Sequence, residues 1–383
     1  MIAVGLMSGT SLDGIDAALV RIVPQGTRYS LELLEFVTLP FDDELAALVR
    51  AVVPPSVPGP ALVADVHRRM GFALARAARN ASGGARVDYV ASHGLTLYHD
   101  GPHHLTTQIG DPFVLREALH ASVCYDFRSA DCAAGGHGAP LVPYVDALLV
   151  ASDDEDRIAL NVGGIANLTA LPRGASKNDV VAFDTGPGVM LVDAFVRERS
   201  RGEAAMDIDG AIAAAGVKND LLLEDMLSDP YFSAAPPKST GRERFGAQFL
   251  EQHGERLERL SVEDGLATLT ELTAVTIANA VEAVELADAH IFCSGGGARN
   301  LFLMRRLAAR LPKARIEPSD AVGLPIDAKE AIAFAVLGYE TLRERASNVP
   351  RVTGASRAVG LGSIAPWRLR ELLAEVDVEC QSS

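Results

Sequence analysis

The opening of the chain carries the stretch that decides the fold, Ser8-Gly9-Thr10-Ser11-Leu12-Asp13-Gly14-Ile15-Asp16, between an apolar strand at residues 2–6 and a second strand. Glycines allow the backbone to turn tightly and approach an anion, while hydroxyls and successive N–H groups supply donors. The two carboxylates would repel phosphate unless a divalent cation stood between them, which favours a magnesium nucleotide over bare phosphate. A polar hairpin of ordinary turn residues is the alternative interpretation.

Length and composition indicate a globular protein of about two domains. The chain has 383 residues, of which 48% are hydrophobic and 22% are charged. The formal net charge of -15 argues against a nucleic-acid partner, because binding a polyanion relies on clustered Lys and Arg. The four cysteines show no C-x-x-C or Cys/His metal spacing, and no apolar stretch reaches membrane-spanning length. We therefore expect free thiols, no membrane partner and a cytoplasmic location.

The pattern of the first half repeats in the second half. A strand at residues 158–162, the turn Gly163-Gly164 and a returning strand at 165–169 echo the opening hairpin. Further strands and helices follow each hairpin, which is the pattern of a duplicated α/β domain. The expected domains are residues 1–145, with the C-terminal helix at 365–383 packing back on them, and residues 146–364.

Asp184 is the carboxylate that the sequence singles out first. It follows a buried strand at residues 180–183 and precedes Thr185-Gly186-Pro187-Gly188, which opens a helix. Ligand-facing residues of α/β sheets often stand at such a position, and a carboxylate there can accept a proton. A helix N-cap is the alternative role, because Asp is favoured at that place and the helix dipole stabilises its charge. The turn is longer than a cap needs, which favours the functional role.

Three further segments carry candidate site residues. The turn Gly295-Gly296-Gly297 lets a flat ring or a phosphate approach the backbone, or it serves only as a tight crossover. Arg128 lies between two aspartates, either in a surface salt bridge or as a clamp on a substrate carboxylate. Glu330 has apolar neighbours nearly all round, so we expect a buried carboxylate that needs partners. The histidines between residues 93 and 137 fit no metal-binding spacing.

Together these segments resemble one family, the anhydro-N-acetylmuramic acid kinases, which belong to the actin, sugar-kinase and heat-shock ATPase superfamily. The matching motifs are Gly5 to Asp16, Ser92-His93-Gly94, Gln108 to Pro112, Asp126-Phe127-Arg128, Gly138 to Pro143, Asn161 to Asn167, Phe183 to Gly188, Pro236 to Glu243, Gly295-Gly296-Gly297, Asp327 to Ala331 and Thr353-Gly354-Ala355. Each motif alone is weak, but their order over almost the whole chain is highly specific.

The resemblance implies an α/β fold of two facing RNase H-like (actin/sugar-kinase ATPase) domains, with the active site in the cleft between them. It implies ATP and Mg²⁺ as cofactors and a small-molecule amino sugar, 1,6-anhydro-N-acetylmuramic acid, as substrate. It further implies that water opens the anhydro ring and that the product is N-acetylmuramic acid 6-phosphate, in cell-wall recycling. Similar kinases also lead us to expect a homodimer.

The resemblance also assigns roles to residues of this chain. Asp184 matches the catalytic carboxylate, which would take a proton from a water attacking carbon 1 of the sugar. Arg128, His93 and Glu330 are expected to contact the sugar, and Asp13 to orient Mg²⁺ through water. The residues expected to contact the nucleotide are Gly9, Thr10, Ser11, Leu12, Asp13, Gly14, Ile15, Asp16, Gly163, Gly164, Gly295, Gly296 and Gly297.

The sequence departs from the family pattern at three positions. Leu95 and His137 stand where Gln is usual, and Val189 stands where Asn is usual. All three flank site motifs, so they put the details of sugar recognition in question more than phosphoryl transfer. A kinase of the same fold acting on 1,6-anhydroglucose is the nearest alternative. An ATP-driven switch or assembly protein is the alternative of another class, although it would not need Asp184 and Glu330 as a sugar-facing pair.

Overall fold

The computed structural model describes residues 1–9, 14–26 and 28–381, and the chain forms two compact units. Unit 1 comprises Met1–Leu149 and Ala328–Ser383, and unit 2 comprises Val150–Asp327. The predicted second domain was therefore too long, because residues 328–364 return to unit 1. Within the described residues, no helix combines the length and the apolar character that a membrane crossing requires.

Unit 1 is built on a mixed sheet, to which its described residues contribute seven strands. The strands are β1 (Ile2–Ser8), β2 (Gly14–Gln25), β3 (Arg28–Pro40), β4 (Tyr89–Asp100), β5 (Leu105–Ile109), β6 (Ser122–Tyr125) and β12 (Ser363–Ala365). Their order is β12-β6-β4-β1-β2-β3, with β5 paired to β4. Strands β1, β2 and β3 form an antiparallel meander, while β4 runs parallel to β1 and β6 runs parallel to β4.

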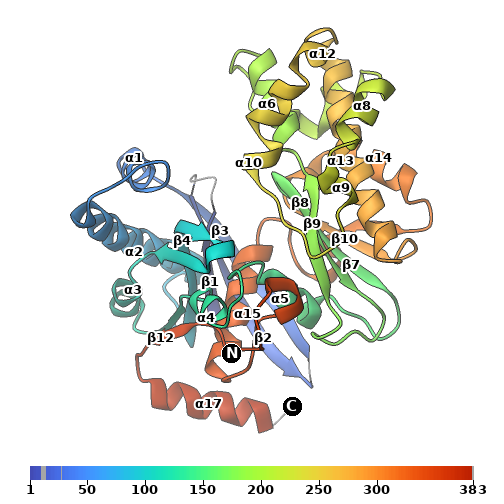
Figure 1. Cartoon of the computed structure of the whole chain (residues 1–383). Helices are drawn as coiled ribbons and strands as arrows, with labels where there is room; N and C mark the ends of the chain where they lie inside the picture. The colour runs from blue at the N-terminus through green and yellow to red at the C-terminus, as the bar shows by residue number, and fades with distance from the viewer. Residues whose placement is uncertain (10–13, 27, 382–383) are drawn as a thin grey trace. The chain divides into compact units, whose positions relative to one another are not determined.

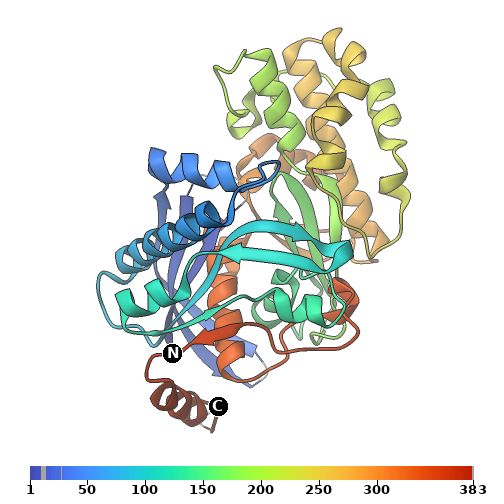
Figure 2. The same cartoon turned by 60° about the vertical axis from the view of Figure 1, so that its left-hand side comes forward.

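Two helices, α2 (Pro60–Ser82) and α15 (Lys329–Leu342), cover opposite faces of this sheet (Figure 1, Figure 2). The apolar side of α2 packs against Val4 and Leu6 of β1. Gly5, between them, faces α15, where a Cβ atom would lie 1.9 Å from the carbonyl oxygen of Ala331. Successive residues of β1 therefore point to opposite faces of the sheet, one face toward α2 and the other toward α15. Because α15 packs directly on the first sheet, the segment after residue 327 belongs to unit 1.

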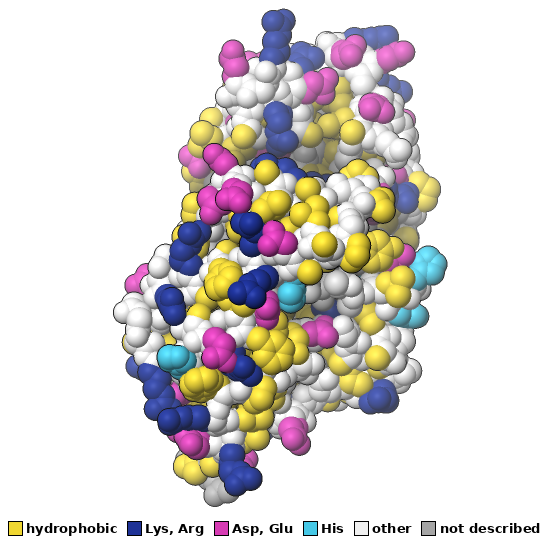
Figure 3. Space-filling view, turned by 90° about the vertical axis from the view of Figure 1, so that its left-hand side faces the viewer, with side chains coloured by type: hydrophobic (Ala, Val, Ile, Leu, Met, Phe, Trp, Pro, Cys, Tyr) yellow, Lys and Arg dark blue, Asp and Glu magenta, His cyan; other side chains and the backbone are white. Residues whose placement is uncertain are grey.

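The shorter helices of unit 1 lie around this core. They are α1 (Asp43–Val52), η1 (Gly101–His103), α3 (Pro112–Leu119), α4 (Ser129–Ala133), α5 (Val142–Leu149), α16 (Pro350–Thr353) and α17 (Leu369–Gln381). On the face that carries α1, α2 and α3, acidic and basic side chains are mixed (Figure 3). Arg69, for example, pairs with Glu44 at 2.9 Å and with Asp65 at 2.8 Å.

Unit 2, all of whose residues 150–327 are described, repeats the topology of unit 1 on a five-stranded sheet. Its strands are β7 (Arg157–Val162), β8 (Ile165–Leu171), β9 (Val181–Pro187), β10 (His290–Ser294) and β11 (Arg315–Pro318). Strands β7, β8 and β9 form an antiparallel meander, and β10 and β11 add parallel to β7. The order β11-β10-β7-β8-β9 matches β6-β4-β1-β2-β3 of unit 1. The predicted duplication of an α/β domain is confirmed.

Helices α13 (Val262–Ala283) and α14 (Leu301–Arg310) cover one face of the second sheet and share a core with β7, β8 and β9. A further helical layer lies at one end of this unit (Figure 1). Its helices are α6 (Met190–Arg199), η2 (Ile208–Gly210), α7 (Ala211–Ala214), α8 (Asp220–Leu227), α9 (Pro230–Ser233), α10 (Arg242–Phe245), α11 (Ala247–Gln252) and α12 (Gly254–Glu258). The short helices η3 (Gly296–Arg299) and η4 (Ser319–Val322) follow β10 and β11.

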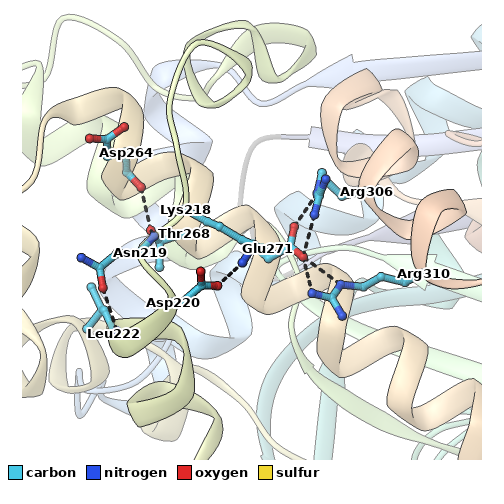
Figure 4. A network of polar contacts seen from close by, with 9 residues as sticks. All are labelled: Lys218, Asn219, Asp220, Leu222, Asp264, Thr268, Glu271, Arg306 and Arg310. Atoms are coloured by element: carbon cyan, nitrogen blue, oxygen red, sulfur yellow. Dashed lines mark hydrogen bonds and ion pairs between the residues drawn. The ribbon is translucent and has the colours of Figure 1, made fainter.

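Polar side chains of α13 bind it to two neighbouring helices, α14 and α8 (Figure 4). The Glu271 carboxylate, 1% exposed, accepts hydrogen bonds from Nη2 of Arg306 at 3.0 Å and from Nε of Arg310 at 2.8 Å. Thr268, one turn earlier, accepts from the N–H of Asn219 at 2.9 Å. These contacts fix α14 and the start of α8 to α13.

Candidate active site

The opening hairpin joins β1 to β2 in unit 1. The Ser8 hydroxyl donates to the carbonyl of Gly14 at 2.8 Å and closes the base of the turn. Asp16 accepts from the hydroxyl of Thr38 at 2.6 Å. The expected nucleotide contacts Thr10, Ser11, Leu12 and Asp13 lie outside the described residues, and so does the expected magnesium role of Asp13. The roles of this hairpin stay predictions.

The second glycine hairpin, Gly163-Gly164, joins β7 to β8 in unit 2. The N–H of Gly188 donates to the carbonyl of Gly164 at 2.8 Å, and that of Val189 to the carbonyl of Gly163 at 2.9 Å. The hairpin is therefore fixed against the turn that follows β9. Glycine is required at 188, because a Cβ atom there would lie 2.1 Å from the carbonyl oxygen of Gly163.

The substitution Gly188→Ala is expected to destabilise the chain by about 1–3 kcal/mol, because its methyl group must separate two hydrogen-bonded turns. Gly296→Ala is the matched control, since a Cβ atom there meets nothing within 4 Å. Urea unfolding of the full chain measures both variants, and the control should stay within about 0.5 kcal/mol of the parent. Equal losses in the two variants would contradict the close approach.

The third glycine turn, Gly295-Gly296-Gly297, lies beside the second. Strand β10 runs parallel to β7, so that Ser294 stands opposite Asn161. A Cβ atom on Gly295 would lie 2.6 Å from Oδ1 of Asn161, and one on Gly297 would lie 2.4 Å from Cγ1 of Val162. The structure therefore brings two expected nucleotide turns together at the carboxyl ends of β7 and β10, where α/β sheets bind ligands.

Asp184 belongs to a row of polar residues across the second sheet. Asn161 of β7 stands opposite Asn167 of β8, which stands opposite Asp184 of β9. Opposite residues on neighbouring strands project from the same face. The row therefore runs from the glycine turns to the candidate catalytic carboxylate. Asn167, which was given no role from the sequence, is its middle member.

The N-cap alternative for Asp184 is wrong. Strand β9 continues through Asp184 to Pro187, because the pairing with β8 extends that far. Helix α6 begins only at Met190, with Val189 as its N-cap. The carboxylate is thus free of the capping role that its sequence position also allowed.

A backbone N–H and a tyrosine hydroxyl from a distant segment hold Asp184 in place. The N–H of Thr240 donates to Oδ2 of Asp184 at 2.9 Å, and the Tyr231 hydroxyl donates to the Asp184 carbonyl at 2.7 Å. Burial raises the pKa of Asp184 to about 6, which the Thr240 hydrogen bond opposes and the charge of Glu243 assists. A carboxyl group with this pKa is better matched to general-base catalysis near neutral pH than a free aspartate.

Lys238 organises the segment that contacts Asp184. Its Nζ donates to the carbonyls of Tyr231 at 3.0 Å and Phe232 at 3.3 Å, and it lies 4.8 Å from the centre of the Tyr231 ring. Burial lowers the pKa of Lys238. The motif from Pro236 to Glu243 was the available sequence signal for Lys238, whereas no pattern pointed to Tyr231.

The three expected sugar contacts lie in unit 1. Nε of Arg128 donates to Nε2 of His93 at 3.0 Å, and its Nη1 donates to the carbonyl of Gly138 at 2.8 Å. Burial lowers the pKa of Arg128, and the charge of Glu330 opposes that shift. The structure therefore brings His93, Arg128 and Glu330 into one electrostatic neighbourhood.

The expectation that Glu330 is buried is wrong. Glu330 itself is exposed, whereas residues 331–335 after it are buried against the sheet. The reason is its place in the first turn of α15, where one side of the helix is left open. The surrounding protein still desolvates the carboxyl and raises the pKa of Glu330, while the charge of Arg128 lowers it.

The aspartates that flank Arg128 have other partners than its guanidinium. Asp126 accepts from the hydroxyl of Ser129 at 2.6 Å. Asp131, with 0% exposure, accepts from the N–H of Gly138 at 2.8 Å and from Thr353 and Asn348 at 2.7 Å each. Asp131 thus fixes Gly138, whose carbonyl accepts the hydrogen bond from Arg128.

The three departures from the family pattern occupy different surroundings. Leu95 is fully buried in the unit 1 core. Val189 donates its backbone N–H to Gly163 and packs its side chain at the edge of the unit 2 core. His137 is exposed, and its N–H donates to the carbonyl of Thr353 at 2.8 Å. Of these three residues, His137 is the most exposed to solvent.

Residues 1–9, 14–26 and 28–381 hold no group of three or more His, Cys, Asp or Glu able to bind a metal ion. Cys124, Cys132 and Cys293 are buried, and Cys124 and Cys132 are free thiols.

Comparison with known proteins places the chain in a family. The sequence profile of the family described as "Anhydro-N-acetylmuramic acid kinase" matches residues 1–367. The anhydro-N-acetylmuramic acid kinase of Streptomyces avermitilis is 42% identical over 374 residues, which cover 96% of this chain and 95% of the relative. That of Streptomyces coelicolor is 43% identical, covering 96% and 94%. That of Caldanaerobacter subterraneus is 37% identical, covering 95% and 96%. The chain therefore belongs to the anhydro-N-acetylmuramic acid kinase family.

Proposed function

We propose that this protein is an ATP-dependent kinase that converts 1,6-anhydro-N-acetylmuramic acid and water to N-acetylmuramic acid 6-phosphate in peptidoglycan recycling. Family membership over nearly the whole chain supports the kinase activity. The observation that carries the chemistry is Asp184, a partly buried carboxyl with its pKa raised to about 6, in one polar row with residues beside the glycine turns.

The chemistry of the anhydro sugar explains why one carboxylate is needed. The oxygen on carbon 6 is an ether oxygen, so it has no proton to lose and cannot attack phosphorus until its bond to carbon 1 breaks. Asp184 takes a proton from a water molecule whose oxygen bonds to carbon 1. The bond between carbon 1 and the ether oxygen breaks, and that oxygen bonds to the γ-phosphorus while ADP leaves. The sum is one water and one ATP consumed for each sugar phosphate.

Residues of unit 1 bind the sugar in this proposal. The guanidinium of Arg128 donates hydrogen bonds to sugar oxygens, and the carboxylate of Glu330 accepts from a sugar hydroxyl. Because Glu330 is exposed, it is open to a ligand without rearrangement of α15.

The glycine hairpins hold the nucleotide in this proposal. Their backbone N–H groups donate to phosphate oxygens, because no side chain keeps the phosphates at a distance. Asp16 offers carboxylate oxygen of the kind that Mg²⁺ prefers, and the expected Asp13 lies outside the described residues. When bound, Mg²⁺ supplies positive charge against the charge that develops on the phosphates.

We further propose that the enzyme is a cytoplasmic homodimer. ATP and a recycled cell-wall sugar both have to be available where it acts, and Cys124 and Cys132 are free thiols, as is usual in a reducing compartment. Light scattering coupled to size-exclusion chromatography measures the oligomeric state. A mass of about 81 kDa, twice the 40.4 kDa of the chain, is expected for a dimer.

A substrate panel tests the proposed function. The purified chain is incubated with ATP and Mg²⁺ and with 1,6-anhydro-N-acetylmuramic acid, 1,6-anhydroglucose or N-acetylmuramic acid, and ADP is measured. We expect ADP release with the anhydromuramic sugar to exceed that with the other two by at least about a hundredfold. Anhydroglucose lacks the polar substituents for which the site is built, and N-acetylmuramic acid lacks the anhydro bridge whose opening is coupled to phosphoryl transfer. A preference for anhydroglucose would refute the proposed substrate and turn attention to His137.

The pH dependence of turnover tests the role of Asp184. Its pKa is raised to about 6, so the carboxyl is protonated below that pH and only the ionised form above it accepts a proton. We expect kcat/KM for the sugar at saturating ATP to rise about tenfold per pH unit up to about pH 6 and then to level off. A flat profile between about pH 5 and 7, with circular dichroism showing a folded chain throughout, would contradict this role.

A further inference from the structure

The guanidinium of Arg128 is held on two sides by hydrogen-bond acceptors. Nε donates to Nε2 of His93 at 3.0 Å, and Nη1 donates to the carbonyl of Gly138 at 2.8 Å. These two bonds fix the plane of the guanidinium group. The other N–H groups, both on Nη2 and one on Nη1, have no hydrogen-bond partner among the described residues. Arg128 therefore presents a fixed set of donors to a ligand.

The contact with Arg128 determines which nitrogen of His93 carries the proton. A guanidinium group only donates, so Nε2 of His93 must present its lone pair. Nδ1 lies 3.1 Å from the carbonyl oxygen of Gly94, which only accepts, so Nδ1 must carry the hydrogen. The ring is thus neutral and protonated on Nδ1. Both ring nitrogens are engaged, which leaves neither for a substrate.

The surroundings of His93 keep this state in place. The residue is 3% exposed, and its ring centre lies 4.6 Å from that of Phe334 on α15. Burial and the charge of Arg128 both lower the pKa of His93. Gly94 has a φ of +71° and approaches β5 so closely that a Cβ atom would lie 2.4 Å from the carbonyl oxygen of Ile109. This fixed turn places the Gly94 carbonyl beside Nδ1.

We propose that His93 is a positioning residue, a neutral imidazole protonated on Nδ1 whose Nε2 orients the Arg128 guanidinium for the sugar. This inference rests on the proposed function of Arg128 and replaces the expected direct contact between His93 and the sugar. A neutral acceptor is required here, because a protonated ring would place a donor and a positive charge against Arg128. Phe or a positively charged residue at 93 would leave Nε of Arg128 without its acceptor.

Two substitutions separate positioning from a merely structural role. His93→Phe keeps a ring against Phe334 but removes the acceptor, whereas His93→Gln places an amide oxygen at the distance of Nε2. We expect His93→Phe to raise the KM for the sugar roughly tenfold or more, with the KM for ATP unchanged and kcat within about threefold. His93→Gln should return the KM for the sugar to within about threefold of the parent. Equal losses in the two variants, or no loss in His93→Phe, would overturn the proposal.

A double-mutant cycle shows whether His93 acts through Arg128. In the background of Arg128→Lys, which cannot make the same fork of bonds, His93→Phe should change the KM for the sugar by less than about twofold. Additive losses in the double variant would mean that His93 acts independently of Arg128, which contradicts the proposal.

The protonation of His93 can be measured without any activity. Imidazole ¹⁵N spectra of the full chain labelled on histidine distinguish the two neutral tautomers from the charged ring, and loss of a signal in His93→Gln identifies His93. The proposal expects a neutral ring protonated on Nδ1 at pH 7. An Nε2-protonated or charged ring would overturn it. If the parent enzyme fails to phosphorylate the sugar, the proposed function fails, while the spectrum still decides the geometry.

Discussion

Replacing Asp184 with asparagine is expected to lower turnover of the anhydro sugar by about a hundredfold or more while leaving the protein folded. The amide cannot take the proton of the attacking water, so the contribution of a general base is lost. Its oxygen can still accept from the N–H of Thr240, the bond now made at 2.9 Å, so the local structure is retained. Steady-state assays of the sugar reaction measure the loss, and a variant with more than about a tenth of the parent activity would contradict the role.

The same substitution is expected to stabilise the protein at alkaline and neutral pH. Folding raises the pKa of Asp184 from 3.8 to about 6. The ionised carboxylate therefore destabilises the folded state fully above pH 6. This destabilisation disappears below pH 3.8, where the carboxyl is protonated in both the folded and the unfolded state. The shift corresponds to at most about 3 kcal/mol. Urea unfolding should therefore show the asparagine variant to be more stable than the parent at pH 8, with the difference shrinking as the pH falls toward 4.

Asp193 provides the matched control for both measurements. Burial also raises its pKa to about 6, and it lies on α6 rather than in the polar row of the sheet. Asp193→Asn is expected to bring a similar gain in stability above pH 6 without loss of sugar turnover. Loss of activity in both variants would show that the assay reports a general disturbance of unit 2 and not the removal of a base.

The largest expected effect on stability comes from Asp131→Asn. The carboxylate is fully buried, and its two oxygens accept from Gly138, Asn348 and Thr353 at 2.7–2.8 Å. An amide must turn an N–H₂ group toward at least one of these donors. Because each unsatisfied buried group costs about 1–3 kcal/mol, and more where a charge was involved, we expect a loss of about 2–4 kcal/mol.

Urea unfolding of Asp131→Asn measures this loss, with Asp126→Asn as the control. Asp126 lies in the same segment, but its hydrogen bond to Ser129 is at the surface and an asparagine oxygen can still accept it. The control should lose less than about 1 kcal/mol. A loss below about 1 kcal/mol in Asp131→Asn would contradict the account of this network. Asp131→Asn should also bind the sugar more weakly, because Gly138 accepts a hydrogen bond from Arg128, the proposed sugar contact.

The architecture could be predicted where the sequence signal is local. The glycine turns and the apolar strands around them recur in each half, and the structure confirms two sheets of matching strand order. The boundary after residue 327 could not be predicted, because α15 joins unit 1 through a contact between Gly5 and Ala331, which are far apart in the chain. The extension of β9 through Asp184 was missed for a similar reason, since pairing with β8 overrides the turn-like residues.

The site could be predicted only as single residues. Asp184, Arg128, His93 and Glu330 stood out by type and motif, but their partners come from elsewhere in the chain. Thr240 reaches Asp184 from 56 residues away, and His93 meets Arg128 across 35 residues. A sequence pattern does not show that both nitrogens of a histidine are engaged, so a sugar contact was the natural expectation. Burial of Asp131 and exposure of Glu330 likewise follow from packing and not from their neighbours in sequence.

The mass of the product shows whether ring opening and phosphoryl transfer are coupled. The full chain is incubated with ATP, Mg²⁺ and 1,6-anhydro-N-acetylmuramic acid, and the sugar product is identified by mass spectrometry while ADP is counted. The account predicts a sugar that has gained one phosphoryl group and one water, with one ADP for each, and none of this product from Asp184→Asn. A phosphorylated sugar that keeps its anhydro ring, or ADP without any sugar phosphate, would contradict the coupling of ring opening to phosphoryl transfer.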